Sequence, residues 1–73
     1  MKVTIKPFGI VRKYCAETSL ELSDDHVASD LTELLQIPHE IRPVVFVNNK
    51  RADSNKKLSD RDEIKIISLI TGG

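Results

Sequence analysis

The sequence has few of the residues that let a small chain gain stability or chemistry without a packed core. Its 73 residues include one cysteine, Cys15, and no tryptophan. A single cysteine cannot form an intramolecular disulfide, and alone it cannot hold a structural zinc ion. It also excludes a plant-type iron–sulfur site, which needs four cysteine ligands. Stability must therefore come from one thin core of Ile, Val and Leu, since so short a chain buries only about 60% of its unfolded surface.

Long apolar runs are absent as well. No segment approaches the roughly 20 consecutive apolar residues that span a bilayer. Residues 1–6 alternate between polar and apolar side chains, which is unlike a secretory signal peptide. We therefore expect a cytoplasmic protein that does not enter a membrane.

The charges cancel but are segregated along the chain, with 11 basic and 11 acidic residues. Residues 1–16 carry bases and no acid, whereas residues 17–40 carry acids and no Lys or Arg. With no basic excess and few aromatic residues, the sequence lacks the features typical of nucleic-acid binding. The segregation is either a solvated surface or a means of orienting a protein partner.

Two alternating runs near the start predict an antiparallel hairpin. Val3 and Ile5 alternate with polar neighbours, which is the period of a half-buried strand. In the second run, Leu20 and Leu22 point inward between polar residues, and the short connection suits a hairpin.

The middle of the chain predicts one helix, at about Asp25–Gln36. The polar residues 23–25 can accept hydrogen bonds from free helical N–H groups. Pro38 ends the helix because the residue before a proline is pushed out of the α region. One face is expected to be apolar, formed by Val27, Leu31, Leu34 and Leu35.

The second half predicts two further strands. Val44–Val47 is closed by the turn signal Asn48-Asn49. The polar segment 50–57 is expected to bridge a sheet edge, with Leu58 as its anchor, and a tight turn leads into a last strand at Glu63–Leu69. One helix on one face of a mixed sheet of four to five strands is an α+β architecture, the β-grasp or ubiquitin-like fold. We expect a single domain over residues 1–73, with a flexible tail at about 70–73.

The dipeptide Gly72-Gly73 closes the sequence. Glycine has no Cβ, so a partner's narrow channel can close around such a tail and reach its carboxyl group. A terminal carboxylate is an anion at neutral pH and must be activated, as an acyl-adenylate, before a sulfur nucleophile can attack it. The chain has no GxxxxGK[ST] loop for ATP, so a partner must perform the activation. The alternative is a frayed chain end without a function.

Other candidate residues have ordinary structural explanations. Cys15 could relay sulfur or accept an acyl group, but a lone cysteine is usually a small apolar core residue. His26 and His39 have no further ligand at metal-binding spacing, so no metal site is expected. Asp24 and Asp25 could form a paired-carboxylate site, although helix capping accounts for them.

Several segments resemble the MoaD/ThiS family of ubiquitin-like sulfur carriers. Residues 58–73 are similar to the family's ending, L-x-D-G-D-E-V … G-G, and Val45–Asn48 is similar to its V-x-V-N strand and turn. Residues 27–35 lie where the family has its helix, and Ile5–Gly9 resembles the MoaD branch more than the ThiS branch. In two places the sequence departs from the family. Arg61 stands at a usual glycine, and Ser68-Leu69 replaces the paired prolines common in MoaD proteins.

The resemblance implies a carrier rather than an enzyme, with no bound cofactor. An E1-like enzyme would use ATP to adenylate Gly73, and Gly72 would keep the tail narrow. A persulfide enzyme would then supply sulfur for a thiocarboxylate. A molybdopterin-synthase large subunit or a thiazole synthase would then accept that sulfur, for a molybdopterin or thiamine precursor. The alternatives are a modifier conjugated to lysines and a non-covalent interaction module.

The strand alternation also predicts a partner-docking surface on a protein that is monomeric by itself. If Ile64 and Ile66 face the helix, then Ile67 and Leu69 face outward, together with Phe46 and Val44 from the neighbouring strand. An apolar patch on an uncovered sheet face is typical of a partner site. The alternative is that a loop covers this surface or that β-bulges change the alternation of the strands.

Overall fold

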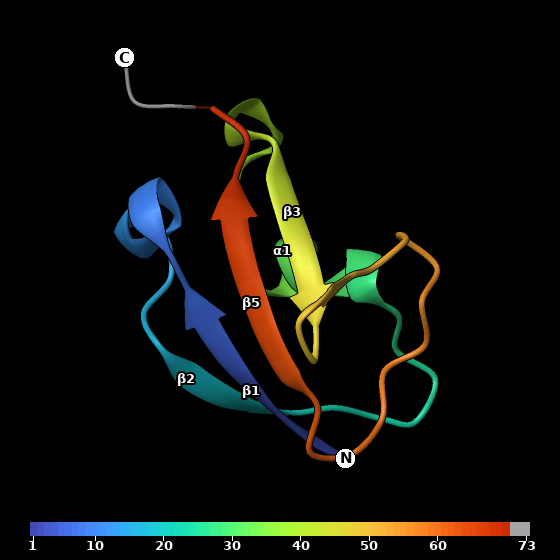
Figure 1. The fold of residues 1–73 in the computed structure, drawn as a ribbon. Coiled ribbons are helices and arrows are strands. Elements are labelled where there is room, and N and C mark those ends of the chain that lie inside the picture. Colours follow the sequence, from blue (N-terminus) through green and yellow to red (C-terminus); the bar gives the residue numbers. More distant parts are fainter. Residues whose placement is uncertain (71–73) are drawn as a thin grey trace.

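The computed structural model describes residues 1–70 and shows a five-stranded mixed sheet with one α-helix against one face (Figure 1). The strand order is β2-β1-β5-β3-β4, so the last strand lies at the centre. Strand β5 pairs in parallel with β1 and antiparallel with β3. This arrangement confirms the predicted β-grasp fold. In chain order the elements are β1 (Lys2–Pro7), the 3₁₀-helix η1 (Gly9–Lys13), β2 (Thr18–Glu21), α1 (Ala28–Leu34), the 3₁₀-helix η2 (His39–Ile41), β3 (Pro43–Val47), β4 (Lys50–Arg51) and β5 (Glu63–Ser68).

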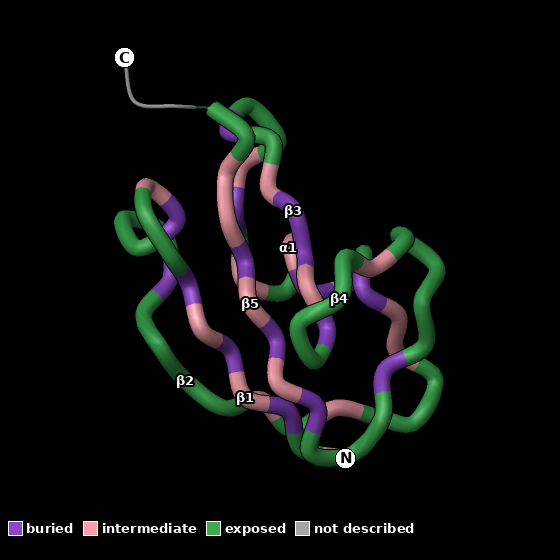
Figure 2. Tube along the Cα trace, viewed as in Figure 1, coloured by how far each residue is buried: buried purple, intermediate pink, exposed green. Residues whose placement is uncertain are grey.

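The core lies between the sheet and α1, and the predicted alternation of the strands is confirmed. Val3 and Ile5 of β1 are fully buried, as are Ile64 and Ile66 of β5, whereas the residues between them are partly exposed (Figure 2). The predicted hairpin of β1 and β2 is present. Leu58 is also buried in this core, so it anchors the polar segment before it, as predicted.

Helix α1 is shorter than predicted, and the predicted cap is wrong. The carboxylate of Asp30 accepts a hydrogen bond from the backbone N–H of Val27 at 2.9 Å, and Val27 has extended backbone angles. The helix therefore starts at Ala28, because the Asp30 carboxylate in its first turn accepts a hydrogen bond from the backbone N–H just before the helix. Ser23 instead donates to Asp25 at 2.6 Å, outside the helix.

The predicted apolar stripe of the helix is also partly wrong. Ala28 and Leu31 are buried and Leu35 packs against the core, but Leu34 is 51% exposed. With the helix beginning at Ala28, the 3.6-residue period places Leu34 to the side of the buried face. No helix within residues 1–70 is long and apolar enough to cross a membrane.

The sequence did not predict η1, η2 or β4. Strand β4 follows from the turn at Asn48 and Asn49, whose φ angles are 50° and 72°. Positive φ at both central residues is what a two-residue hairpin turn requires, and asparagine tolerates it. The turn signal is therefore confirmed, and the two residues after it pair with β3 as a short edge strand.

Candidate functional site

The working residues predicted from the sequence, Gly72 and Gly73, lie outside the described residues. What the structure describes is the root from which they continue. Strand β5 ends at Ser68, and the backbone N–H of Leu69 donates to the carbonyl of Arg42 at 3.1 Å. The N–H of Ile70 then donates to the hydroxyl of Ser68 at 3.0 Å. The last described residues are thus held against the segment that follows η2.

The sheet face opposite α1 carries an apolar groove that leads to this root. Near the middle of the face, Phe46 of β3 and Ile67 of β5 line a shallow hollow together with Phe8. A second hollow shares Phe8 and Ile67 and continues along η1 as far as Ile70. We call the two together the outer groove; it is lined by Phe8, Gly9, Ile10, Phe46, Asn49, Lys65, Ile67, Ser68 and Ile70.

The four predicted docking residues differ in how far they are exposed. Phe46 and Ile67 are half-buried and border the outer groove, and Leu69 is 55% exposed just beyond it. Val44 lies opposite Ile67 in the β3–β5 ladder, but only 8% of it is exposed. The prediction that Val44 offers contact surface is therefore wrong, because almost none of its side chain is accessible to a partner. That a partner docks on the other three stays a prediction.

A polar network closes the opposite end of β5. Asp62 is only 7% exposed, and its carboxylate accepts hydrogen bonds from the side-chain amide of Asn48 at 2.9 Å and from the backbone N–H of Ser59 at 2.7 Å. The amide oxygen of Asn48 in turn accepts from the N–H of Glu63 at 2.9 Å. Sequence reasoning treated these residues only as turn formers. The available signal was that both Asn48 and Asp62 stand in the motifs that resemble the carrier family.

The turn before β5 has a positive φ angle at the position where arginine stands in place of the family's usual glycine. Arg61 has a φ of 68°, in the left-handed region that glycine adopts most easily. Its N–H donates to the carbonyl of Lys2 at 2.7 Å, and the N–H of Lys2 donates to the Asp60 carboxylate at 2.8 Å. That last hydrogen bond is the main reason that the pKa of Asp60 lies below its usual value.

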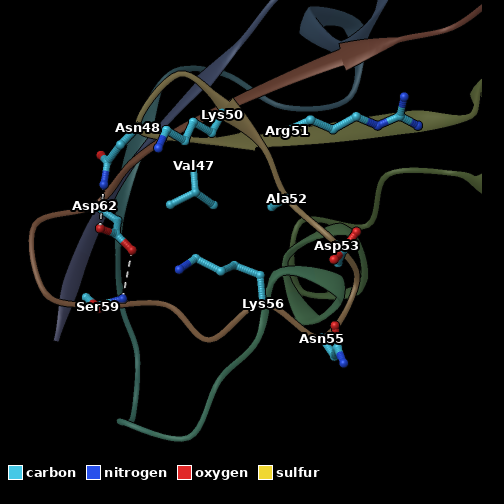
Figure 3. A pocket seen from close by; sticks show the side chains of 10 residues that line it. All are labelled: Val47, Asn48, Lys50, Arg51, Ala52, Asp53, Asn55, Lys56, Ser59 and Asp62. Carbon is cyan, nitrogen blue, oxygen red and sulfur yellow. Dashed lines mark hydrogen bonds between the residues drawn. The ribbon is translucent and has the colours of Figure 1, made fainter.

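A polar hollow lies beside Asp62 (Figure 3). Lys50 from β4 and Lys56 from the following loop extend into it, and neither is within ion-pair distance of a carboxylate in the described part of the chain. Both oxygens of Asp62 are engaged by Asn48 and Ser59. No buried polar group is left to receive a ligand there, because every buried side-chain N or O atom of residues 1–70 has a partner.

The remaining candidates do not assemble into a catalytic or metal site. Cys15 is buried in the core, and burial raises the pKa of its thiol. His26 lies 2.9 Å from the Ser23 hydroxyl, and His39 begins η2. Within residues 1–70, no group of three or more His, Cys, Asp or Glu side chains could hold a metal ion. The hydroxyl of Ser23 and the neighbouring His26 lower the pKa of Asp25, which is consistent with a local turn rather than a paired-carboxylate site.

Comparisons with known proteins agree with this picture. The model of the ThiS family matches residues 5–73. Among solved structures, SAMP1 from Haloferax volcanii matches with a TM-score of 0.80 and 13% identity, over 100% of both chains. A Pyrococcus furiosus protein assigned as molybdopterin converting factor subunit 1 matches with 0.77 and 22%, over 94% of this chain and 98% of that one.

A third solved structure, the complex of subunits 1 and 2 of the molybdopterin-converting factor from Helicobacter pylori, contains a similar chain. It matches with a TM-score of 0.67 and 22% identity over 100% of both chains. At these identities the solved structures establish the fold alone. A comparison with curated protein sequences finds no match.

Proposed function

The chain belongs to the ThiS family of small ubiquitin-like sulfur carriers, and on that premise we propose that it carries sulfur on the carboxyl group of Gly73. In this proposal partner enzymes bind the folded domain, and the domain itself catalyses no step. The observation that carries the proposal is the position of the root: Ile70 is 41% exposed and lies at the end of the outer groove. A partner seated on that groove would receive the residues after Ile70 directly.

The chemistry requires two transfers. A carboxylate oxygen of Gly73 attacks the α-phosphorus of ATP, and pyrophosphate leaves. The persulfide of a second enzyme then attacks the acyl-adenylate and AMP leaves. A thiol of that enzyme next attacks the enzyme's own sulfur in the acyl disulfide, which breaks the S–S bond, releases the thiocarboxylate and leaves a disulfide in the enzyme. Adenylation is needed because the free carboxylate, with a pKa of about 3.3–3.7, is an anion at neutral pH and a poor electrophile.

Partners must supply every catalytic group. The sequence has no phosphate-binding loop of the GxxxxGK[ST] type, and Cys15 is buried with a raised thiol pKa, so it is a poor nucleophile. We therefore propose an E1-like adenylating enzyme, a persulfide donor and a sulfur-accepting synthase as partners. Phe46, Ile67 and Leu69 offer them an apolar surface beside the root.

The test is ATP–pyrophosphate exchange by a purified E1-like enzyme, with three forms of the chain compared. The unchanged chain should support exchange. A chain lacking Gly73, and a full-length chain whose Gly73 carries a C-terminal amide, should support none, while both melt at the same temperature as the unchanged chain. The amide is the sharper control, because it keeps the length of the tail and removes only the carboxylate. Exchange with the amide would contradict the proposal.

A second candidate function uses the same carboxylate. The likeness to SAMP1, described in a further structure as a small archaeal modifier protein, supports a modifier joined to lysines. Digests of cell protein separate the two roles. Lysines of other proteins that carry residues 66–73 as a branch, the remnant left when trypsin cleaves after Lys65, would favour the modifier, and a thiocarboxylate on Gly73 would favour the carrier.

A further inference from the structure

We infer that Ser68 is a positioning residue: its hydroxyl sets the direction in which the chain leaves the sheet toward Gly73. The inference rests on the proposed function, because direction matters only if a partner must receive the carboxyl end. Ser68 is among the residues that line the outer groove, but its hydroxyl is engaged by the backbone of Ile41 and Ile70 and so has a role that docking alone does not explain.

The hydroxyl of Ser68 joins two segments far apart in the sequence. It donates to the carbonyl of Ile41 at the end of η2, 27 residues earlier, and accepts the N–H of Ile70 at 3.0 Å. One bond fixes Ser68 to η2, and the other fixes the backbone two residues beyond it. The neighbouring bond from the N–H of Leu69 to the carbonyl of Arg42 uses backbone atoms only. Among the described residues, Ser68 is thus the side chain that ties residues 69–70 to the body of the protein through hydrogen bonds.

Small changes at this root have large consequences farther along. Three residues follow Ile70, the last of them Gly73, and together they reach at most about 10 Å. A change in the direction at which the chain leaves Ile70 therefore shifts the whole region that the carboxyl group can sample. Adenylation needs that group near the α-phosphate of ATP, and misplacement by about 1 Å can cost as much as 100-fold in rate.

The effect should be separable from docking. Binding to the partner depends on the outer groove, whose central members are Phe46 and Ile67. Replacing Ser68 by alanine leaves that apolar surface in place. We therefore expect the loss in kcat rather than in KM, because KM follows the fit of the sheet face and kcat follows placement of the carboxyl group.

The experiment measures ATP–pyrophosphate exchange with an E1-like enzyme as a function of carrier concentration. Ser68→Ala should lower kcat about tenfold with KM within about twofold. The isosteric pair Ser68→Thr and Ser68→Val both suit a strand and differ only in the hydroxyl, so threonine should restore the rate and valine should not. Ser19→Ala, at an exposed serine on the edge strand β2, serves as the matched control and should behave as the unchanged chain.

Hydrogen exchange of the Ile70 amide gives a second readout that needs no partner. The amide should be protected in the unchanged and Ser68→Thr chains, and should lose protection in Ser68→Ala and Ser68→Val while the melting temperature stays above the assay temperature.

Each contrary result is distinct. Equal kcat for the threonine and valine variants overturns the inference and leaves the proposed function intact. A rise in KM at constant kcat also overturns it, because Ser68 would then act in binding the partner rather than in placing the carboxyl end. No exchange with the unchanged chain overturns the proposed function, and the inference with it.

Discussion

The two ends of β5 are held in different ways (Figure 1). At the first end, the buried carboxylate of Asp62 and the amide of Asn48 join the β3–β4 turn to the β4–β5 loop and to the start of β5 through side-chain hydrogen bonds. At the other end, the hydroxyl of Ser68 donates to the carbonyl of Ile41 in η2, and the backbone N–H of Leu69 donates to the carbonyl of Arg42 just after it. The first end secures the central strand, whereas Leu69 and Ile70 at the second end are exposed. A small carrier can therefore fix its fold at one end and present its carboxyl group at the other.

Removing the Asp62 carboxylate should have the largest effect on stability. Asp62→Ala leaves the amide of Asn48 and the N–H of Ser59 without an acceptor, so we expect a loss of about 2–3 kcal/mol in the free energy of unfolding. Urea unfolding measures it. Asp53→Ala, which removes an exposed acid elsewhere in the same β4–β5 loop, should change stability by less than about 0.5 kcal/mol. If the two variants lost equal free energy of unfolding, the Asp62 network would not be what secures the first end of β5.

A charge in the outer groove should act on binding instead. Ile67→Asp places a carboxylate in the apolar surface beside the root, so the KM for the carrier in ATP–pyrophosphate exchange should rise at least about tenfold, or about 1.4 kcal/mol. Ser19→Asp puts the same charge on the same sheet face at β2, away from the groove, and should leave KM unchanged. If Ile67→Asp binds normally, the groove is not the docking surface.

Relieving the turn at Arg61 should stabilise the first end slightly. Glycine adopts a φ of 68° without strain, so Arg61→Gly should raise the free energy of unfolding by about 0.5–1 kcal/mol after the greater freedom of the unfolded chain is counted. Arg61→Ala keeps the Cβ and should bring no gain. A gain of equal size with alanine would show that charge, rather than backbone strain, matters at this position.

Cys15 should have the smallest effect on function. Because burial raises its thiol pKa, the folded protein should react slowly with iodoacetamide at neutral pH, and Cys15→Ala should leave sulfur transfer unchanged. The unfolded thiol ionises at lower pH than the folded one, so its contribution to stability is present below the unfolded pKa and falls as pH rises through that value. Rapid modification of the native protein, or loss of transfer, would support a sulfur relay instead.

The strands could be predicted from the sequence because their signal is local. Val3 and Ile5 alternate with polar residues, and the same period in β5 placed Ile64 and Ile66 in the core. The start of α1 could not be placed in this way. Several residues before it are of types that can cap a helix. In the structure, however, Asp30 within the first turn stabilises the helix start by accepting a hydrogen bond from the N–H of Val27.

The candidate site could be predicted only in part, since its contacts join distant segments. The alternation correctly placed Phe46 and Ile67 on one face, but the burial of Val44 depends on the packing of paired strands. The hydrogen bond from Ser68 to Ile41 spans 27 residues, and neither residue carries a local signal of it. Side-chain to backbone bonds of this kind become visible only when the chain is folded.

The central claim is that the domain presents the carboxyl group of Gly73 for sulfur transfer. Intact-mass analysis of the protein purified from its own cells tests it most directly, with fragmentation to locate any change. The account predicts a fraction of chains that end at Gly73 and carry one oxygen-to-sulfur exchange at that residue, lost on mild hydrolysis. Chains that continue beyond Gly73 without being processed back to it, or that never carry sulfur there, would contradict the account.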